Sequence, residues 1–359
     1  MQPSGGARGR PWRRAAVAAA VALALGACGE AVPSTGAVDG TAAEEPTTST
    51  DASSEPGASP SPAVDASTST PPATGLSAAD ALADAQLYGV TAVGDGLVVV
   101  GSRDGVAAAW TSDDGQTWRE AEVAGARHAE RLRAVAAGPD GLVAFGGPDD
   151  AASAVWTSED GAVWTPQPSA DVGARINAVT AADGRWLAVG DIVGGEGGEA
   201  VAGAVYESRD GQSWQLVSDG LEGSELTVTD VAADGVTVVS GFDVQGGSIW
   251  LDPAEDVQRV TDGFTGTTIQ GVALTGEGFV TGEGFVALGR GIADLLPVAW
   301  TSPDGRAWQQ LDVDPQPFPP TTEIHDLVAA DDGLVAVGAS ELGGVIWTTD
   351  DGGTWTMQP

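Results

Sequence analysis

The phrase "TSDDGQTW" occupies residues 111–118, and "TTDDGGTW" occupies residues 348–355 near the C-terminus. Three weaker copies lie between them: "TSEDGAVW" (157–164), "ESRDGQSW" (207–214) and "TSPDGRAW" (301–308). A short polar residue followed by glycine favours a tight turn, because glycine adopts backbone angles that other residues avoid. Each phrase follows a short apolar run, so each is predicted to turn the chain between two β-strands rather than to carry out chemistry.

The turn phrase belongs to a longer unit that occurs six times. A short apolar strand ending in glycine recurs as "LVVVG", "LVAFG", "WLAVG", "VTVVSG", "FVALG" and "LVAVG", and its last residue is Gly101, Gly146, Gly190, Gly241, Gly289 or Gly338. A second apolar stretch and a tight turn precede each copy, and the fourth copy, "GSIWLDPAEDVQ", has lost the glycine of its final turn. Four strands in a repeat of about 47 residues are typical of one β-propeller blade.

We therefore predict an all-β, six-bladed β-propeller of four-stranded antiparallel blades over residues 76–359. The blades are expected to start near residues 87, 132, 176, 228, 269 and 324. A seventh blade stays open only if residues 76–86 contain one. Ser77 in that stretch is instead a suitable N-cap for a short helix, "AADALADAQ".

Residues 1–27 have the pattern of a secretory signal peptide. Four arginines precede an uncharged run, "AAVAAAVALALGA" (15–27), which is shorter than the roughly 20 residues that a membrane span needs. The stretch "LGAC" (25–28) resembles the bacterial lipobox, which implies that Cys28 receives a diacylglyceryl group and becomes the new N-terminus. An ordinary secretory signal with an incidental cysteine is the alternative, and two neighbouring arginines leave twin-arginine export open.

Residues 28–75 consist largely of Ala, Ser, Thr, Pro, Gly and acidic residues, without one aromatic residue. Such a segment buries too little apolar surface to offset chain entropy, so it is predicted to be a disordered tether. With a lipid on Cys28, this tether is expected to hold the propeller at the extracytoplasmic face of the cell membrane.

Composition excludes several classes of function. The formal net charge is −36 and all 15 basic residues are arginine, which argues against binding of nucleic acid or of anionic lipid through basic patches. One cysteine and two histidines provide neither a disulfide framework nor a His-rich zinc site. We expect a monomer without metal or cofactor, and the acidity is compatible with either a high-GC genome or adaptation to salt.

The turn phrases match the Asp-box, or BNR, pattern of Ser/Thr, any, Asp, any, Gly, any, Thr and aromatic. Thr111, Asp113, Gly115, Thr117 and Trp118 fill this pattern, and so do Thr348, Asp350, Gly352, Thr354 and Trp355. In the other copies Glu159, Arg209 and Pro303 replace the aspartate, whereas Gly161, Gly211, Gly305, Trp164, Trp214 and Trp308 remain. Retention of the glycine and tryptophan without the carboxylate indicates a structural staple, in which the indole packs over the hairpin.

These boxes and the apolar strands resemble the sialidase-like propeller superfamily over about residues 87–359. A sialidase of that group uses three arginines on the substrate carboxylate, a Tyr–Glu nucleophile pair and an acidic Asp. The Arg-Ile-Pro signature is absent here, the only tyrosines are Tyr88 and Tyr206, and no motif places Tyr88 with Arg133, Arg175 and Arg290. We therefore predict a non-catalytic propeller that recognises an envelope protein, a glycan or a peptide, with an exo-sialidase-like glycoside hydrolase as the alternative.

The predicted binding face is the one where the first strand of every blade begins, because the variable connections emerge there. Alignment of these strands gives "LYGV", "LRAV", "INAV", "VTDV", "IQGV" and "IHDL", whose second residues are Tyr88, Arg133, Asn177, Thr229, Gln270 and His325. The third residue is small or acidic, as in Asp230 and Asp326. Either these residues are the solvated lining of a channel, or they form a polar ring that recognises a ligand at its mouth.

Arg133 is expected to matter most in this ring, because a guanidinium group offers bidentate recognition of a carboxylate in an otherwise acidic domain. Arg127, Arg131 and Arg175 lie on the loops that enter the first strands of the second and third blades, and they are expected to add to a local positive field. His325 stands beside Asp326, a pair that we interpret as a local hydrogen bond rather than a catalytic dyad.

Overall fold

The computed structural model describes residues 75–358 except residues 139, 169, 171, 195–198, 222–225, 254–256, 276–282, 320, 331–332 and 342. The chain divides into two units, Met1–Ser67 and Thr68–Pro359, and every described residue lies in the second. The predicted signal peptide, Cys28 and almost all of the predicted tether therefore lie outside the described residues.

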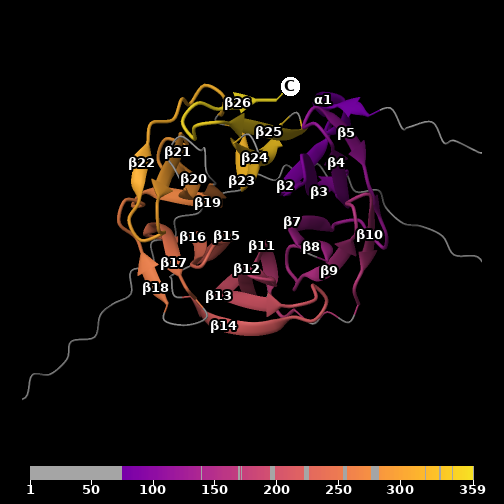
Figure 1. Ribbon diagram of the computed structural model, residues 1–359, viewed down its shortest axis with the longest axis horizontal. Coiled ribbons are helices and arrows are strands. Elements are labelled where there is room, and N and C mark those ends of the chain that lie inside the picture. The colour runs from indigo at the N-terminus through magenta and orange to yellow at the C-terminus, as the bar shows by residue number, and fades with distance from the viewer. Residues whose placement is uncertain are drawn as a thin grey trace, which may run out of the picture. The chain divides into compact units, whose positions relative to one another are not determined.

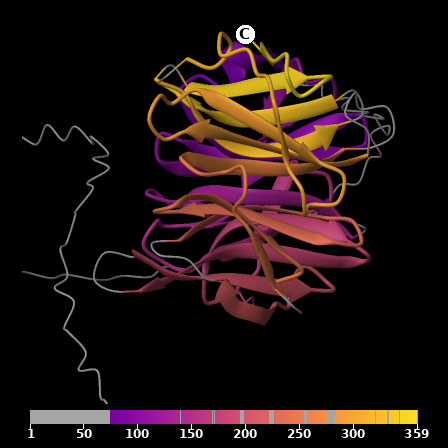
Figure 2. The same cartoon turned by 90° about the vertical axis from the view of Figure 1, so that its left-hand side faces the viewer.

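The described part of the second unit is a six-bladed β-propeller, as predicted, with six separate sheets arranged around a central axis (Figures 1 and 2). The first three blades contain β2 (Ala85–Val93), β3 (Gly96–Arg103), β4 (Val106–Ser112) and β5 (Thr117–Glu120); β7 (Arg131–Gly138), β8 (Gly141–Gly147), β9 (Ala154–Ser158) and β10 (Val163–Pro166); and β11 (Arg175–Ala182), β12 (Arg185–Gly194), β13 (Glu199–Ser208) and β14 (Gln215–Leu221).

The last three blades follow the same order of four antiparallel strands. They contain β15 (Thr227–Ala233), β16 (Thr237–Asp243), β17 (Gly246–Leu251) and β18 (Gln258–Val260); β19 (Thr267–Thr275), β20 (Gly284–Gly291), β21 (Pro297–Ser302) and β22 (Gln309–Leu311); and β23 (Glu323–Ala330), β24 (Gly333–Ser340), β25 (Gly343–Thr349) and β26 (Thr356–Met357). Two short outer strands are additions: β1 (Leu76–Ser77) pairs with β5 of the first blade, and β6 (Glu122–Val123) pairs in parallel with β10 of the second.

The predicted helix is present but shorter than its sequence pattern suggested. Ser77 caps α1 (Ala78–Ala81) by accepting a hydrogen bond from the Asp80 amide at 3.3 Å. The helix ends before Ala85, because from that residue onward the backbone pairs with β3 in the first blade.

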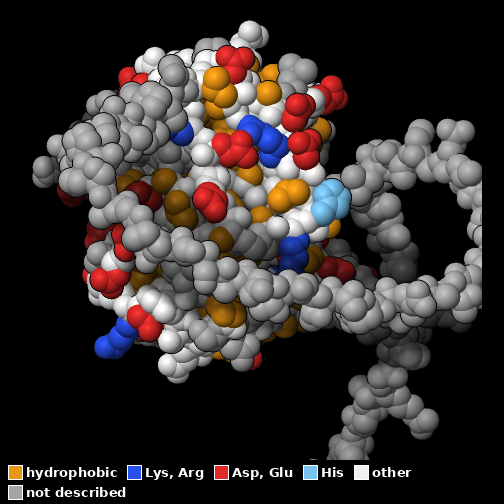
Figure 3. Space-filling view, turned by 90° about the vertical axis from the view of Figure 1, so that its right-hand side faces the viewer, with side chains coloured by type: hydrophobic (Ala, Val, Ile, Leu, Met, Phe, Trp, Pro, Cys, Tyr) orange, Lys and Arg blue, Asp and Glu red, His pale blue; other side chains and the backbone are white. Residues whose placement is uncertain are grey.

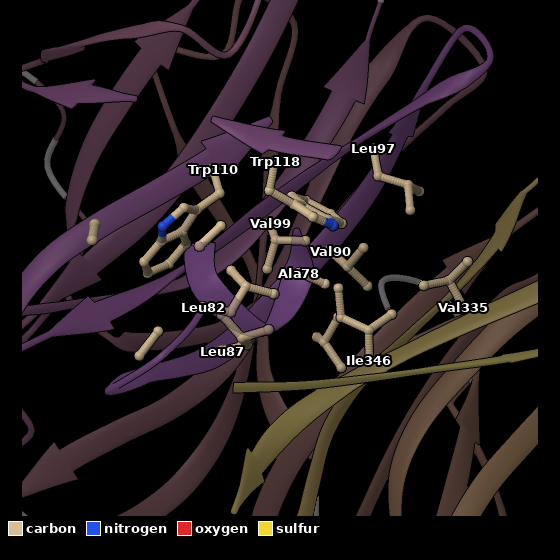
Figure 4. Packing of buried hydrophobic residues seen from close by; sticks show 14 residues of the cluster. Ala78, Leu82, Leu87, Val90, Leu97, Val99, Trp110, Trp118, Val335 and Ile346 are labelled. Atoms are coloured by element: carbon tan, nitrogen blue, oxygen red, sulfur yellow. The ribbon is translucent and has the colours of Figure 1, made fainter. Parts of the chain in front are cut away.

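The core lies between neighbouring blades. Each blade is covered on both faces, so its second strand is a continuous apolar run rather than an alternating one. Figure 4 shows the cluster at the junction of the first and sixth blades, where Trp110 and Trp118 lie with Val335 and Ile346. The ring is therefore closed by apolar packing between the two ends of the propeller.

Every innermost strand contains one β-bulge at the same place. The register shifts lie between Leu87 and Gly89, Leu132 and Ala134, Ile176 and Ala178, Val228 and Asp230, Ile269 and Gly271, and Ile324 and Asp326. The extra residue is the second one of the aligned stretch in all six blades. A bulge bends the strand and changes the direction of its side chains, so it places these six residues at the start of the channel.

The same bulge explains the glycine that ends each second strand. A Cβ atom at these glycines would lie between 1.8 and 2.4 Å from a carbonyl oxygen of the innermost strand. The residues concerned are Gly101, Gly146, Gly190, Gly241, Gly289 and Gly338. Glycine therefore recurs at this position because the backbones of the innermost and second strands of each blade lie very close together.

The five tryptophan-terminated turns share two hydrogen bonds: an aspartate accepts from the amide two residues later, and the indole donates to the carbonyl of the turn glycine. In the first, Asp114 accepts hydrogen bonds from the amides of Gln116 at 2.8 Å and Thr117 at 2.6 Å, and the Trp118 indole donates to the Gly115 carbonyl at 3.2 Å. The corresponding carboxylates are Asp160, Asp210, Asp304 and Asp351. The bond from Thr117 is the largest cause that lowers the pKa of Asp114 to about 2, with help from Gln116.

The carboxylate of each turn is thus one residue later than predicted. Asp113 instead pairs with Arg119 at 2.8 Å on the surface, and Asp350 is exposed. The hydroxyl that accepts turn amides belongs to Thr349 rather than Thr348, and to Ser112 rather than Thr111 in the first turn. Glu159, Arg209 and Pro303 therefore do not mark a lost carboxylate, because the next residue in each copy is an aspartate.

Candidate functional site

A cavity of about 320 Å³ opens where the innermost strands begin. Its lining includes five of the eight predicted binding residues: Tyr88, Arg133, Asn177, Thr229 and His325. A second cavity of about 200 Å³ lies further along the same strands and is lined by Asp230, Asp326 and small or aliphatic residues. Gln270 lines neither of these two cavities. The eight predicted residues therefore do not form one ring: five line the mouth cavity, two line the inner cavity and Gln270 lies outside both.

Three arginines of the second and third blades converge on one exposed aspartate at the mouth. Arg131 binds Oδ2 of Asp149, and Arg133 binds its Oδ1. Arg175 donates to the Asp149 carbonyl oxygen at 2.9 Å and to Oδ2 of the fully buried Asp191 at 2.8 Å. Arg131 and Arg133 come from β7, and Arg175 opens β11, so two adjacent strands form the whole cluster.

This cluster is a local positive site in a strongly acidic protein. Three guanidinium groups face two carboxylates, Asp149 and Asp191, whereas the formal net charge of the chain is −36. On the side of the molecule drawn in Figure 3, acidic side chains are scattered among single arginines. Arg133 is 8% exposed, and burial lowers its pKa while Asp149 counteracts that effect. The Asp149 side chain is 60% exposed, so it is the solvent-facing partner of the cluster.

An aromatic pair lines the mouth beside the arginine cluster. The rings of Tyr88 and His325 stack with centroids 4.6 Å apart, and the Arg131 guanidinium lies 4.8 Å from the centre of the Tyr88 ring. The Tyr88 hydroxyl accepts a hydrogen bond from Arg131 at 2.5 Å and donates to Gln86 at 2.7 Å. Burial is the main cause that raises the pKa of Tyr88. The flat tyrosine ring is therefore held between a cation and an imidazole.

His325 does not form the predicted pair with Asp326. Its Nδ1 lies 2.6 Å from the Leu87 carbonyl oxygen and its Nε2 lies 3.2 Å from Oε2 of Glu323. The bulge between Ile324 and Asp326 directs the two neighbouring side chains to different layers of the channel. Sequence adjacency alone suggested a contact that the backbone geometry prevents.

Three ring residues hold neighbouring blades together. Asn177 donates to the Val228 carbonyl at 2.7 Å, Thr229 donates to the Ile269 carbonyl at 2.8 Å, and His325 reaches the Leu87 carbonyl. In each case the acceptor is the first aligned residue of the following innermost strand, with the first blade following the sixth. These side chains therefore have a structural role that the sequence did not reveal, whereas Tyr88 and the arginines make their polar contacts inside the mouth cavity.

Two mouth residues were absent from the sequence prediction. Asp149 follows the glycines that end β8, and Asp191 directly follows the glycine that ends its apolar run. Asp191 is the cross-strand partner of Arg175 in the register of β11 and β12. Opposite charges in directly paired positions indicate an ion pair once the strand register is known. The register of β11 and β12 includes a bulge, so this pair could not be identified from the sequence.

The residues considered for a glycosidase site do not all lie in one cavity. Tyr88, Arg133 and Arg175 share the mouth cavity. Arg290 instead donates to the carbonyl oxygens of Leu295 and Thr322 between the fifth and sixth blades. Tyr206 is 5% exposed and accepts a hydrogen bond from the Gly173 amide at 3.1 Å, away from the channel.

Within the described ranges, no group of three or more His, Cys, Asp and Glu side chains is arranged to hold a metal ion. Among the same residues, no helix is both long enough and apolar enough to cross a membrane.

Comparison with protein-family models gave no match, and comparison with curated proteins gave none. Among solved structures, the chain is similar to the six-bladed fungal lectin of Aleuria aurantia, at 9% identity and a TM-score of 0.53, over 77% of this chain and 95% of the lectin. It also matches YCF48 from Cyanidioschyzon merolae, at 16% identity and a TM-score of 0.44, over 77% and 86% of the two chains. An exo-β-1,3-galactanase from Phanerochaete chrysosporium matches at 9% identity and a TM-score of 0.42, over 62% and 65%.

The fold and the site define a β-propeller with a polar cavity at the mouth of its channel. The likeness to the lectin is one of fold alone, because the identity is only 9%. The β-propeller part of the sequence resemblance is thereby confirmed, and membership of the sialidase-like superfamily stays a prediction.

Proposed function

We propose that this protein is a non-catalytic propeller that binds a glycan at the mouth of its channel. The observation that carries the proposal is the mouth cavity itself, which combines the stacked Tyr88 ring with three arginines that share one exposed aspartate. The Tyr88 ring already stacks on His325 and contacts the Arg131 guanidinium, so it supports the arginines, and the converging polar groups of the cavity are those that can orient the hydroxyl groups of a sugar. The fucose-recognising lectin of the same six-bladed fold supports a glycan over an envelope protein or a peptide.

Asp149 indicates which chemical group the arginines accept. Its two carboxylate oxygens are divided between Arg131 and Arg133, an arrangement that fits a planar anion with two oxygens. The Asp149 side chain is 60% exposed whereas Arg133 is buried, so a ligand carboxylate would reach the same guanidinium groups by taking the place of the Asp149 carboxylate. We therefore infer that the preferred glycan carries a carboxylate and displaces Asp149 on binding.

Replacement of Arg133 by alanine is expected to weaken binding of acidic oligosaccharides by roughly tenfold to hundredfold, the effect of losing one hydrogen bond to a charged group. Titration calorimetry with uronic acid-containing and neutral oligosaccharides measures the effect. Arg119→Ala is the matched control, because Arg119 pairs with Asp113 at a turn on the opposite side of the blade.

Equal affinities of the parent, Arg133→Ala and Arg119→Ala for acidic oligosaccharides would show that the ligand does not bind at the mouth cavity. Hydrolysis of a glycoside by the parent that is lost in Tyr88→Phe would instead favour the glycoside hydrolase alternative. In that case the same cavity would be an active site, since Tyr88 lies inside it.

The proposal includes a lipid anchor, which rests on the lipobox-like stretch ending at Cys28. We expect the protein to incorporate labelled fatty acid and to sediment with membranes in a bacterial host, with the propeller on the outer side. Cys28→Ser is expected to abolish both the label and the sedimentation. A Cys28→Ser protein that is labelled like the parent would contradict the anchor while leaving the glycan-binding proposal untouched.

A further inference from the structure

Two aspartates meet across the channel directly below the mouth. Asp230 lies on β15 of the fourth blade and Asp326 on β23 of the sixth, and both carboxyl groups line the inner cavity, where each affects the pKa of the other. Gly271, on the innermost strand of the fifth blade, lies between them in chain order. A Cβ atom at Gly271 would lie 2.6 Å from Cβ of Leu327, so only glycine allows the fifth and sixth blades to approach this closely.

Each aspartate also binds the backbone of the next blade. Asp230 accepts hydrogen bonds from the amides of Val231 and Val272, both at 2.7 Å. Asp326 accepts from the amides of Leu327 and Val90, both at 2.8 Å. In the part of the chain that the structure describes, the six sheets are separate, so these carboxylates supply polar contacts between innermost strands.

The bond from Val90 to Asp326 crosses the seam where the last blade meets the first. All four strands of the sixth blade come from the C-terminal part of the chain, and no N-terminal strand among the described residues completes it. Besides apolar packing, the described part of the seam has the isolated bridge between Ala83 and Gly343, a bond from the Gly344 amide to the Leu82 carbonyl at 3.2 Å, and the contact of His325 with the Leu87 carbonyl. Asp326 is therefore one of few polar links that keep the ring closed.

A hydrogen bond between two carboxyl groups requires a proton on one of them. Desolvation is the main cause that raises the pKa of both groups, to about 7 for Asp326 and well above the usual value for Asp230, where the Asp326 charge adds to the effect. His325 lowers the pKa of Asp326 from the same strand, and Glu323 is paired to His325 on its far side. The other residues that line this layer are uncharged.

We propose that one proton shared by Asp230 and Asp326 locks the inner ring across the seam. Asp230 carries the proton and donates it to the Asp326 carboxylate. When the proton leaves, two negative charges face each other in the channel and push apart the strands that they connect. The bonds to the amides of Val272 and Val90 are then weakened together, and the ring is easier to open.

The direction of the pH effect follows from the raised pKa values. The folded protein holds more protons than the unfolded chain above about pH 4, so stability falls as the pH rises toward about 7 and continues to fall while Asp230 keeps its proton. Asp230→Asn keeps a permanent donor in the place of the protonated carboxyl. We expect its thermal midpoint to fall less than that of the parent on going from about pH 5 to about pH 8.

The experiment compares thermal unfolding of the full chain for the parent, Asp230→Asn and Asp113→Asn. Asp113→Asn is the control, because Asp113 is exposed and its pair with Arg119 lies on the surface. Parallel curves for the parent and the control, with a flatter curve for Asp230→Asn, support the shared proton. The same steep fall in all three variants would overturn it.

Infrared spectroscopy of the parent provides a second readout that does not depend on the folding of a variant. A protonated carboxyl group absorbs at a frequency distinct from that of a carboxylate, so the shared proton is expected as a protonated band that persists at about pH 6, where ordinary aspartates are ionised. Absence of this band would contradict the proposal even if Asp230→Asn failed to fold.

Discussion

Replacement of Trp118 by alanine is expected to lower the free energy of unfolding by about 3–5 kcal/mol, the range for loss of a large buried aromatic side chain. The Trp118 side chain is 1% exposed and packs in the cluster between the first and sixth blades (Figure 4). Its indole also donates to the Gly115 carbonyl. Alanine would leave a cavity at the seam and remove the donor from the turn.

Chemical denaturation of the full chain, followed by circular dichroism, measures this effect. Leu216→Ala is the matched control, because Leu216 is 42% exposed and an exposed substitution is expected to change stability by about 0.5 kcal/mol or less. A Trp118→Ala protein as stable as Leu216→Ala would show that the indole does not staple the hairpin.

Replacement of Gly338 by alanine is expected to lower the free energy of unfolding by about 3 kcal/mol, the upper end of the range for an overpacked interior. The new Cβ atom would lie 1.8 Å from the Glu323 carbonyl oxygen and 2.9 Å from its carbonyl carbon. Both atoms belong to the backbone, so no side-chain rotation relieves the contact. The innermost strand β23 and its neighbour β24 must therefore separate, and the mouth residue His325 on β23 moves as a result.

Gly220→Ala is the control for this prediction. A Cβ atom at Gly220 has open space around it, with no heavy atom within 4 Å. Equal unfolding midpoints for Gly338→Ala and Gly220→Ala in the same denaturation series would show that the bulge does not require glycine. The result bears on all six blades, because each repeats the same close approach.

The six-bladed fold was predictable because its determinants repeat along the chain. Each blade carries its own apolar strands, its own closing glycine and, in five blades, its own tryptophan turn. Spacing alone therefore indicates the number of blades and the strands that are buried. The innermost strands begin at Ala85, Arg131, Arg175, Thr227, Thr267 and Glu323, within two residues of the predicted starts at 87, 132, 176, 228, 269 and 324.

The choice between adjacent residues was less predictable. Asp113 and Asp114 are chemically identical neighbours, and only the left-handed backbone of Gly115, with φ of 68°, decides which carboxylate turns back onto the following amides. In the same way, aligned letters do not reveal a bulge, so His325 and Asp326 looked like partners although they face different layers.

By itself, the sequence determined the propeller, its repeat and the face on which polar residues gather, because those properties are set within one blade of about 47 residues. Only the tertiary structure decided which of these residues meet. Asp149 is reached by arginines from two blades, and Asp326 binds the amide of Val90, which lies 236 residues earlier in the chain. The first contact exists only after neighbouring blades have packed against each other, and the second only after the ring has closed, since closure brings the innermost strands of the first and sixth blades within hydrogen-bond distance.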